Sequence, residues 1–450
     1  MPAADSLDRV SETVAVSALA PANDPSFENV WDEIVWRGLV HVSTDQEALR
    51  ALLAGDPITY YCGFDPTAPS LHLGNLVQLL LMRRLQLAGH KPLGLVGGST
   101  GLIGDPRPTA ERTLNTKDTV AEWVGYLRAQ VERFLSFEGD NAARMVNNLD
   151  WTAPLSAIDF LRDIGKHFRV GKMIAKDAVS ARLNSEAGIS YTEFSYQILQ
   201  AMDYLELYRR YGCTLQTGGS DQWGNLTAGV DLIRRVEGVG VHALAINLVT
   251  KADGTKFGKT AGGAIWLDKQ MFSPYAFHQY WLGADDRDIE PWMKVFSLRP
   301  RAEIEALLDE GRQAPQRRIP QRALADELTT LVHGPDELAA ADLAGRALFG
   351  RGELGELDPA ALSAALAEAG TTEIARVDGA LPSVAEVLRD TGLAKGLGDA
   401  RRAISEGGAY INNERVSDPE ARLCDAQILG DGLVVVRRGK RNVRGARVIA

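Results

Sequence analysis

The sequence is poor in cysteine and has no long apolar run. Its 450 residues contain three cysteines, Cys62, Cys213 and Cys424, and these lie too far apart to form a C-x-x-C pair. They can build neither a disulfide framework nor a four-ligand zinc site. No stretch of about 18 consecutive apolar residues occurs. These absences exclude small disulfide-rich proteins, zinc-ribbon proteins and membrane-spanning helices, and they favour a reducing, cytoplasmic setting.

The N-terminus lacks the basic start and apolar run of a secretory signal peptide, so we expect residues 1–26 to form a flexible extension. There is also no internal repeat. The net charge of −10 argues against a protein that coats nucleic acid wholesale. The charge is uneven, however, because residues 382–450 carry 12 basic and 9 acidic side chains. The C-terminal segment is therefore the basic part of an acidic chain.

Length and composition indicate a soluble protein of two or three domains, with 45% hydrophobic and 24% charged residues. The first half alternates between apolar strands and amphipathic helices. We predict strands over 58–64 and 93–97, and helices over 71–89, 119–138 and 156–165. Such alternation is typical of an α/β fold with a parallel sheet.

The second half divides into segments of different character. A helix over 193–211 is predicted from the capping-box spacing of Ser190 and Glu193 and from Gly212 at its end. We expect an α/β domain over 27–273, a helical domain over 274–335, and a loosely packed connector over 336–381, which is rich in Ala, Leu, Gly and Glu. Short helices followed by short strands then predict a small α+β domain over 382–450.

The stretch PTAPSLHLGN, residues 66–75, places His72 and Asn75 at the opening turn of a helix, with Gly74 between them. Free N–H groups and the helix dipole attract anions there, and an imidazole adds a hydrogen-bond donor. The segment is therefore a candidate phosphate site, although an ordinary helix start would show the same residue pattern.

The stretch KFGKT carries Lys256 and Lys259 three residues apart, with Thr260 as a further donor. It suits a phosphate chain, and equally a solvated basic turn. It is not a P-loop, because only three residues separate Gly254 from Gly258 where that loop requires four.

Two further stretches carry polar groups suited to a small ligand. In the 193–211 helix, Tyr196, Gln200 and Asp203 share one face, which fits either a polar ligand or solvent. In GGSDQWGN, residues 218–225, Asp221 and Gln222 offer a carboxylate and an amide suited to sugar hydroxyls. The same residues would also suit a structural turn.

The combined order of YCGFDPTAPSLHLGN, LVGGSTGLIGDP, EFSYQILQAMD, GGSDQWGN and KFGKT resembles the bacterial tyrosyl-tRNA synthetases. The resemblance runs from about Phe27 to the C-terminus. HLGN stands where the class I pattern has His-Ile-Gly-His, with Asn75 in place of the second histidine. KFGKT stands where the pattern has Lys-Met-Ser-Lys-Ser.

The resemblance implies a Rossmann-like catalytic domain and a two-step reaction. The carboxylate of L-tyrosine attacks the α-phosphate of ATP to give tyrosyl-adenylate and pyrophosphate, and the 3′ end of tRNA(Tyr) then takes the tyrosyl group. Mg²⁺ is expected to arrive on the ATP phosphates, with no metal ligated by the protein. The resemblance also implies a cytoplasmic homodimer that does not bind membranes, and an alpha-L-type RNA-binding domain over 382–450.

The resemblance further implies a role for each site residue. The catalytic group, which acts on the phosphates, is Thr67, His72, Lys256, Lys259 and Thr260. The tyrosine-binding group comprises Tyr61 and Asp203 at the phenolic hydroxyl and Asp105, Tyr196 and Gln200 at the α-ammonium. The ATP-binding group is Cys62, Gly63, Asp65, Gly74, Asn75, Asp221, Gln222 and Lys259.

Other functions share some of these features. A nucleotidyltransferase that adenylates a small molecule would share the histidine-glycine signature, but it would not need a basic C-terminal domain. A non-catalytic RNA-binding regulator would not need both signatures. Tryptophanyl-tRNA synthetase is the nearest rival within the class, and Tyr61 with Asp203 suits a phenol better than an indole.

Overall fold

A computed structural model describes residues 23–106, 114–186, 188–255, 257–260, 263–440 and 442–449. By its internal contacts the chain divides into two units. One comprises Met1–Asp268 and Ala284–Leu324, and the other Lys269–Gly283 and Ala325–Ala450. The boundary falls within helix α16 (Ile319–His333), so the predicted domain of 274–335 is helical but is shared between the two units.

The first unit is built on a six-stranded sheet in the order β1-β6-β5-β2-β3-β4. The strands β2 to β6 are parallel, and only the edge strand β1 runs antiparallel to its neighbour β6. The predicted parallel sheet is therefore confirmed. The strands are β1 (Val40–Ser43), β2 (Thr59–Phe64), β3 (Lys91–Val96), β4 (Arg144–Asn147), β5 (Cys213–Gly219) and β6 (His242–Ile246).

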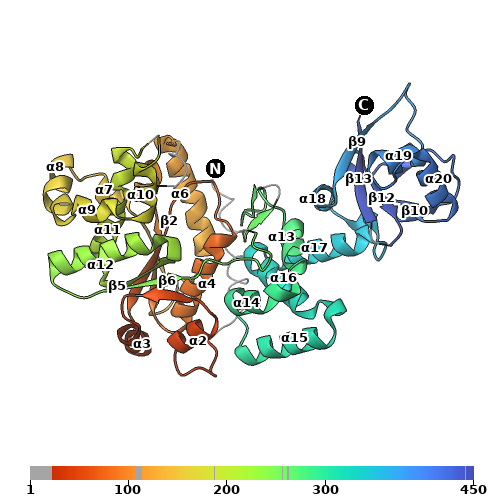
Figure 1. Ribbon diagram of the computed structural model, residues 1–450. Helices are drawn as coiled ribbons and strands as arrows, with labels where there is room; N and C mark the ends of the chain where they lie inside the picture. The colour runs from red at the N-terminus through yellow and green to blue at the C-terminus, as the bar shows by residue number, and fades with distance from the viewer. Residues whose placement is uncertain are drawn as a thin grey trace, which may run out of the picture. The chain divides into compact units, whose positions relative to one another are not determined.

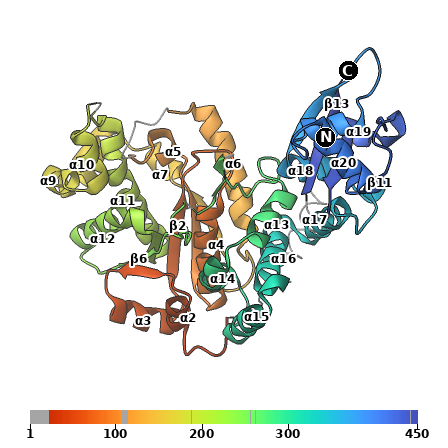
Figure 2. The same cartoon turned by 45° about the vertical axis from the view of Figure 1, so that its right-hand side comes forward.

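Helices cover both faces of this sheet. Helices α4 (Leu73–Leu87) and α6 (Lys117–Glu132) lie on one side, and α11 (Tyr191–Tyr211) and α12 (Trp223–Glu237) lie side by side on the other (Figures 1 and 2). The predicted ends of α11 are confirmed, because the Ser190 side chain accepts from the Glu193 N–H and Gly212 is left-handed, with φ 62°. These helices bury the apolar faces of the parallel strands.

The order of the strands indicates where a ligand site is expected. From β2 the chain moves to β3 and β4 on one side, and it then returns to β5 on the other side of β2. In open parallel sheets, ligands bind outside the carboxyl ends of the strands where the order reverses in this way. The carboxyl ends of β2 and β5 are therefore the expected location of the site.

The remaining elements of the first unit are short or peripheral. Residues 156–165 are helical as predicted, but the helix is irregular, because Phe160–Ile164 form a π-helical turn. The other elements are α2 (Val30–Trp36), α3 (Gln46–Ala54), α5 (Thr100–Ile103), α7 (Leu149–Thr152), α8 (Ala157–Asp159), α9 (Val170–Ile174), α10 (Asp177–Leu183), β7 (Lys259–Thr260), β8 (Gly263–Ala264), α14 (Asp286–Phe296) and α15 (Arg301–Gln313).

The second unit contains a five-stranded sheet in the order β11-β10-β12-β13-β9, in which only β13 and β9 are parallel. The strands are β9 (Thr371–Ala375), β10 (Ala409–Ile411), β11 (Glu414–Val416), β12 (Leu433–Arg438) and β13 (Asn442–Ile449). The helices that belong to this unit are α13 (Pro274–Leu282), α17 (Pro335–Leu348), α18 (Pro359–Ala369), α19 (Val384–Asp390) and α20 (Leu397–Ser405).

The expected loose packing of residues 336–381 is wrong. Ala344 and Ala347 of α17 and Leu366 of α18 are fully buried, in one hydrophobic cluster with Leu433 and other residues of β12 and β13. Strand β9 also pairs with β13. Alanine-rich helices pack closely because their side chains are small, so this composition supports a dense core here.

No helix in the described part of the chain is long and apolar enough to cross a membrane.

Candidate active site

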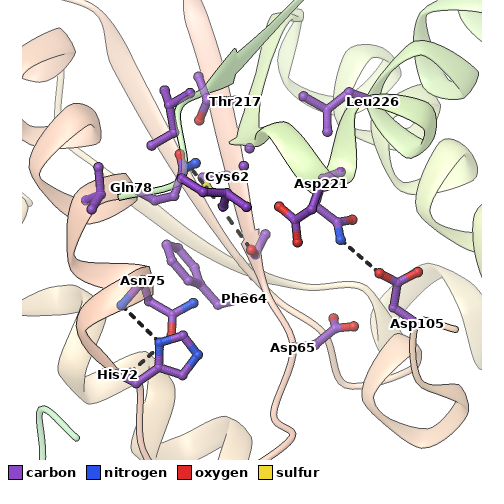
Figure 3. A pocket seen from close by; sticks show the side chains of 18 of the residues that line it. Cys62, Phe64, Asp65, His72, Asn75, Gln78, Asp105, Thr217, Asp221 and Leu226 are labelled. Carbon is purple, nitrogen blue, oxygen red and sulfur yellow. Dashed lines mark hydrogen bonds between the residues drawn. The ribbon is translucent and has the colours of Figure 1, made fainter. Parts of the chain in front are cut away.

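A cavity of about 690 Å³ opens at the carboxyl ends of β2 and β5, where the strand order reverses (Figure 3). Its size is typical of a small-molecule site. The structure brings fifteen of the predicted residues to this one cavity: Tyr61, Cys62, Gly63, Asp65, Thr67, His72, Gly74, Asn75, Asp105, Tyr196, Gln200, Asp203, Asp221, Gln222 and Lys259. Lys256 and the side chain of Thr260 lie outside what the structure describes.

His72 is the N-cap of α4, and Figure 3 shows its ring at the cavity beside Asn75. Its Nδ1 accepts from the Gly74 N–H at 3.0 Å, and the Asn75 side-chain oxygen accepts from the His72 N–H at 3.1 Å. Because Nδ1 accepts, the neutral ring carries its proton on Nε2. Burial lowers the pKa of His72, and the charge of Lys259 lowers it further. At neutral pH the imidazole is therefore an uncharged donor.

This cap explains the glycine and the asparagine of HLGN. A Cβ on Gly74 would lie 2.8 Å from His72 Cε1, closer than carbon atoms approach, so only glycine fits beneath the ring. Asn75 completes a capping box with its oxygen, which leaves its amide N–H groups for other partners. In this chain, Asn75 fixes the helix start and faces the cavity at the same time.

Tyr61 and Asp203 line the cavity and are each about 2% exposed. The carboxylate of Asp203 accepts from Trp151 Nε1 at 2.8 Å and from Asn148 Nδ2 at 3.0 Å. Burial nevertheless raises the pKa of Asp203 to about 7. The Tyr61 hydroxyl has no hydrogen-bond partner among the described residues. Asp203 is thus held in place, while Tyr61 still has a hydrogen bond to make.

Asp65 directly follows β2 and joins two neighbouring elements. Its carboxylate accepts from the Thr100 hydroxyl at 2.6 Å and from the Tyr196 hydroxyl at 2.7 Å. A Cβ on Gly97 would lie 2.0 Å from Asp65 Oδ1, so the glycine-rich turn after β3 makes room for this carboxylate. Asp65 therefore lies with Tyr196, a residue predicted to bind the α-ammonium.

Asp105 is held by the start of α12. Gln222 Nε2 donates to Asp105 Oδ2 at 2.8 Å, the contact that Figure 3 marks, and Asn225 Nδ2 donates to Oδ1 at 3.3 Å. Asn225 also donates to Gln222 Oε1 at 2.9 Å, which fixes the orientation of that amide. Burial lowers the pKa of the nearby Lys176 to about 8, and Asp105 partly offsets this effect.

Several buried polar atoms around the cavity have no hydrogen-bond partner among the described residues. They are Tyr61 Oη, Gln78 Nε2, Gln200 Oε1 and Gln216 Oε1. Unpaired buried polar atoms are rare in folded proteins, because each costs about 1–3 kcal/mol. A cluster of them around one cavity indicates a polar ligand.

Sequence reasoning missed Gln78 and Gln216, which both line the cavity. The Cys62 thiol, whose pKa burial raises to about 12, donates to Gln78 Oε1 at 3.7 Å. Gln78 lies one turn after Asn75 in α4, a spacing that places both side chains on one face and could have identified it. Gln216 lies in the middle of β5, where no local pattern marks it.

Residues 257–260, the described part of KFGKT, lead into the antiparallel hairpin of β7 and β8 rather than into a helix. Strand β7 pairs with β8, and the side chain of Lys259 reaches the cavity. The exclusion of a P-loop is consistent with this geometry, since a P-loop leads into a helix. Within the described residues, no group of three or more His, Cys, Asp or Glu side chains is arranged to hold a metal ion.

Comparison with known proteins identifies the class first. Residues 53–350 match the family model of the class I tRNA synthetases (W and Y), and residues 367–444 match the model of the tyrosine–tRNA ligase SYY-like C-terminal domain. The first match covers more than half of the chain and includes the whole cavity. The chain therefore belongs to the class I tRNA synthetases.

Individual relatives narrow the class. The chain is 63% identical to the tyrosine–tRNA ligase of Leifsonia xyli over 430 residues, which cover 95% of this chain and 96% of the relative. It is 61% identical to that of Streptomyces avermitilis over 421 residues, which cover 93% and 99%. Within its class, the chain belongs to the tyrosine–tRNA ligase family.

Among solved structures, a C-terminally truncated mitochondrial tyrosyl-tRNA synthetase of Aspergillus nidulans is similar to this chain. It has a TM-score of 0.64 and 27% identity, and the match covers 76% of this chain and 99% of that one.

Proposed function

We propose that the cavity binds L-tyrosine and ATP together, forms tyrosyl-adenylate, and then passes the tyrosyl group to tRNA(Tyr). The observation that carries this proposal is the set of unpaired buried polar atoms around the cavity. Tyr61, with its unpaired Oη, and Asp203 both line the cavity, as recognition of a phenolic hydroxyl requires. An indole could not both donate to and accept from these two groups.

The amino group of tyrosine is assigned to the middle of the cavity. Tyr196, Gln200 and Asp105 are its proposed partners, and Gln200 Oε1 is an acceptor still without a partner among the described residues. Asp65, held against Tyr196 at 2.7 Å, adds negative charge there. We therefore assign Asp65 to the ammonium as well as to ATP.

The nucleoside of ATP is assigned to the residues around the carboxyl end of β2 and the start of α12. Cys62, Gly63, Gly74, Asn75, Asp221 and Gln222 are the proposed contacts. The Asn75 amide and the Cys62 thiol are neutral donors suited to ribose oxygens. A Cβ on Gly219 would lie 2.4 Å from Asp221 Oδ1, which explains why glycine precedes this carboxylate.

Activation needs no nucleophile from the protein, because the tyrosine carboxylate is ionised at neutral pH and attacks the α-phosphate itself. The chain's contribution is to align the reactants and to stabilise the charge that develops on the phosphates. The neutral His72 ring donates from Nε2, and Lys259 supplies positive charge. Thr67, Lys256 and Thr260 complete the proposed set, and Mg²⁺ enters as part of its ATP complex.

We assign tRNA binding to the second unit. Two basic side chains at the end of β12 make contacts within this unit. Arg437 is buried, with its guanidinium 4.2 Å from the Tyr410 ring centroid, and Arg438 pairs with Asp399 at 2.8 Å. Lys440 and Arg444 are exposed. Lys440→Ala combined with Arg444→Ala should weaken charging at limiting tRNA and reduce its salt dependence, with activation unchanged.

We further propose a cytoplasmic homodimer. The segment from α7 to the start of α11 exposes several large apolar side chains, namely Leu149, Ile158, Leu161, Val170, Ile174, Leu183 and Tyr191. Exposed apolar side chains concentrated in this way are typical of a protein interface. Sedimentation of the wild type and of Val170→Asp tests the proposal, which requires a shift from dimer toward monomer in the variant.

The proposed activity is tested by ATP–pyrophosphate exchange with tyrosine, tryptophan and phenylalanine in parallel. Exchange should depend on tyrosine and be far weaker with the other two amino acids. Exchange driven best by tryptophan would assign the cavity to the rival within the class. Exchange with none of the three would refute the proposal.

A further inference from the structure

Phe257 lies between the two lysines of KFGKT, and its ring is held by helix α14. The centroid of its ring is 5.1 Å from that of Trp292, in an edge-on arrangement, and 5.2 Å from that of Phe296, in a stacked one. Trp292 is 2% exposed and Phe296 is fully buried, so both belong to a fixed part of the first unit. The hairpin that carries Lys259 is therefore attached to α14 by one aromatic side chain.

The end of α14 is in turn fastened to α4. Arg84 of α4 donates to the carbonyl oxygens of Val295 at 3.1 Å and of Ser297 at 2.7 Å. Arg37 donates to the Ser297 carbonyl at 2.8 Å and pairs with Glu33. Both arginines are almost fully buried, and hydrogen bonds to buried charged groups are strong and directional. Trp292 and Phe296 of α14 are thus fixed relative to α4, the helix whose N-cap is His72.

The backbone of the hairpin also contacts the start of α4. The Ile265 N–H donates to the Gly258 carbonyl at 3.0 Å, and the Leu73 N–H donates to the Ile265 carbonyl at 3.0 Å. Gly258 has φ +70°, and a Cβ there would lie 3.2 Å from the Leu73 side chain. The hairpin is therefore attached both to α14, through the Phe257 ring, and to the start of α4, through its backbone. Lys259 of the hairpin and His72 of α4 line the same cavity.

We propose that Phe257 is a positioning residue, whose ring between Trp292 and Phe296 sets the place of Lys259 relative to His72. The inference rests on the proposed function and extends it, because Phe257 would act on the activation step through Lys259 rather than by contact with the reacting atoms. Phe257 also lines the cavity, so a direct contact with the adenine ring is the competing explanation, and the experiment separates the two.

The experiment compares Phe257→Leu and Phe257→Met in wild-type and Lys259→Ala backgrounds, measured by single-turnover activation and by equilibrium binding of tyrosine. An aromatic pair contributes about 0.5–1.5 kcal/mol beyond its buried area, which corresponds to about 2- to 12-fold. Phe257→Leu should slow activation by that factor and leave tyrosine binding unchanged. Phe257→Met should stay close to wild type, because a long thioether side chain packs well against aromatic rings.

The Lys259→Ala background supplies the decisive comparison. If Phe257 acts through Lys259, Phe257→Leu should have almost no further effect once that amine is gone. The matched control is Phe27→Leu, which removes a ring 5.6 Å from Trp36 in the same unit without touching the cavity, and it should leave activation unchanged.

Three results would overturn the proposal. One is an equal loss of rate in both backgrounds, which would mean that the effect does not pass through Lys259. Another is a raised KM for ATP with an unchanged kcat, which would indicate direct contact with adenine. The third is unaltered activation by Phe257→Leu. A wild-type protein that activates no amino acid would refute the proposed function itself. The wild type is assayed first, so this outcome is separated from the three results above.

Discussion

Replacing Tyr61 with phenylalanine should raise the stability of the free protein and lower its preference for tyrosine over phenylalanine. The Tyr61 hydroxyl is buried and has no partner among the described residues, so the protein without substrate bears the cost of an unsatisfied polar group. That cost is about 1–3 kcal/mol, and deleting the oxygen also leaves a small void. We therefore expect Tyr61→Phe to stabilise the free protein by about 1 kcal/mol, which raises the melting temperature by about 2 °C.

The same change should weaken the preference for tyrosine over phenylalanine. A hydrogen bond between Tyr61 and the substrate hydroxyl is worth about 0.5–1.5 kcal/mol, so the ratio of kcat/KM values should fall by about 2- to 12-fold. Asp203 remains to recognise the hydroxyl, which keeps the loss within this range. ATP–pyrophosphate exchange with the two amino acids measures the ratio, and thermal unfolding without substrate measures the stability.

Tyr60→Phe is the matched control. Tyr60 is the preceding residue in β2 and is equally buried, but its hydroxyl donates to the Met82 carbonyl. Its loss should therefore lower the stability and leave the substrate preference alone. If Tyr61→Phe destabilised the protein as Tyr60→Phe does, and kept the wild-type preference, the hydroxyl would have a structural partner and the assignment would be wrong.

Three further predictions concern charge. Lys259→Ala should slow activation by about 100- to 1,000-fold with tyrosine affinity unchanged, and single-turnover rates equal to wild type would contradict its role. Tyrosine binding without ATP should weaken below pH 7, because the Asp203 carboxyl, whose pKa burial raises to about 7, accepts the phenol more strongly when it is ionised; a flat profile in fluorescence titrations would exclude this. The same shift makes the folded protein bind more protons than the unfolded chain between about pH 4 and 7, so this group's contribution to stability falls as the pH rises through that window. Arg182→Ala should cost about 3–5 kcal/mol in urea unfolding, because it removes the buried guanidinium that pairs with Glu193 at 2.9 Å, where both side chains are 1% exposed. Arg234→Ala, which breaks an exposed pair, should cost less than about 1 kcal/mol.

Sequence patterns predicted the parallel sheet and drew attention to several residues that line the cavity, because these features rest on local signals. Apolar runs marked β2 and β3, and Ser190 with Gly212 marked the ends of α11. The glycines of HLGN and GGSDQWGN marked close approaches that the structure explains by steric contact with His72 and Asp221. Helical spacing also placed Tyr196, Gln200 and Asp203 on one face, and all three line the cavity.

What the sequence could not predict depends on contacts between distant segments. The hydrogen bonds from Trp151 and Asn148 to Asp203 join residues more than 50 positions apart. Arg84 donates to the carbonyls of Val295 and Ser297, more than 200 positions away. The packing of 336–381 was missed because an alanine-rich helix has the same local pattern whether it is loose or buried. Arg437 is one of the 12 basic residues counted over 382–450, but it packs against Tyr410 and is buried.

The last strand of the second unit also has a consequence for synthesis of the chain. Strand β13 lies inside its sheet, between β12 and β9, and not at an edge. The ribosome makes it after the other four strands, so β9 and β12 lack their β13 partner until residues 442–449 emerge. A chain released before Asn442 would keep two open strand edges and an uncovered apolar core, features that lead to aggregation. Synthesis through β13 is thus a condition for folding of this unit, and chains terminated before Asn442 should be substrates for chaperones and proteases.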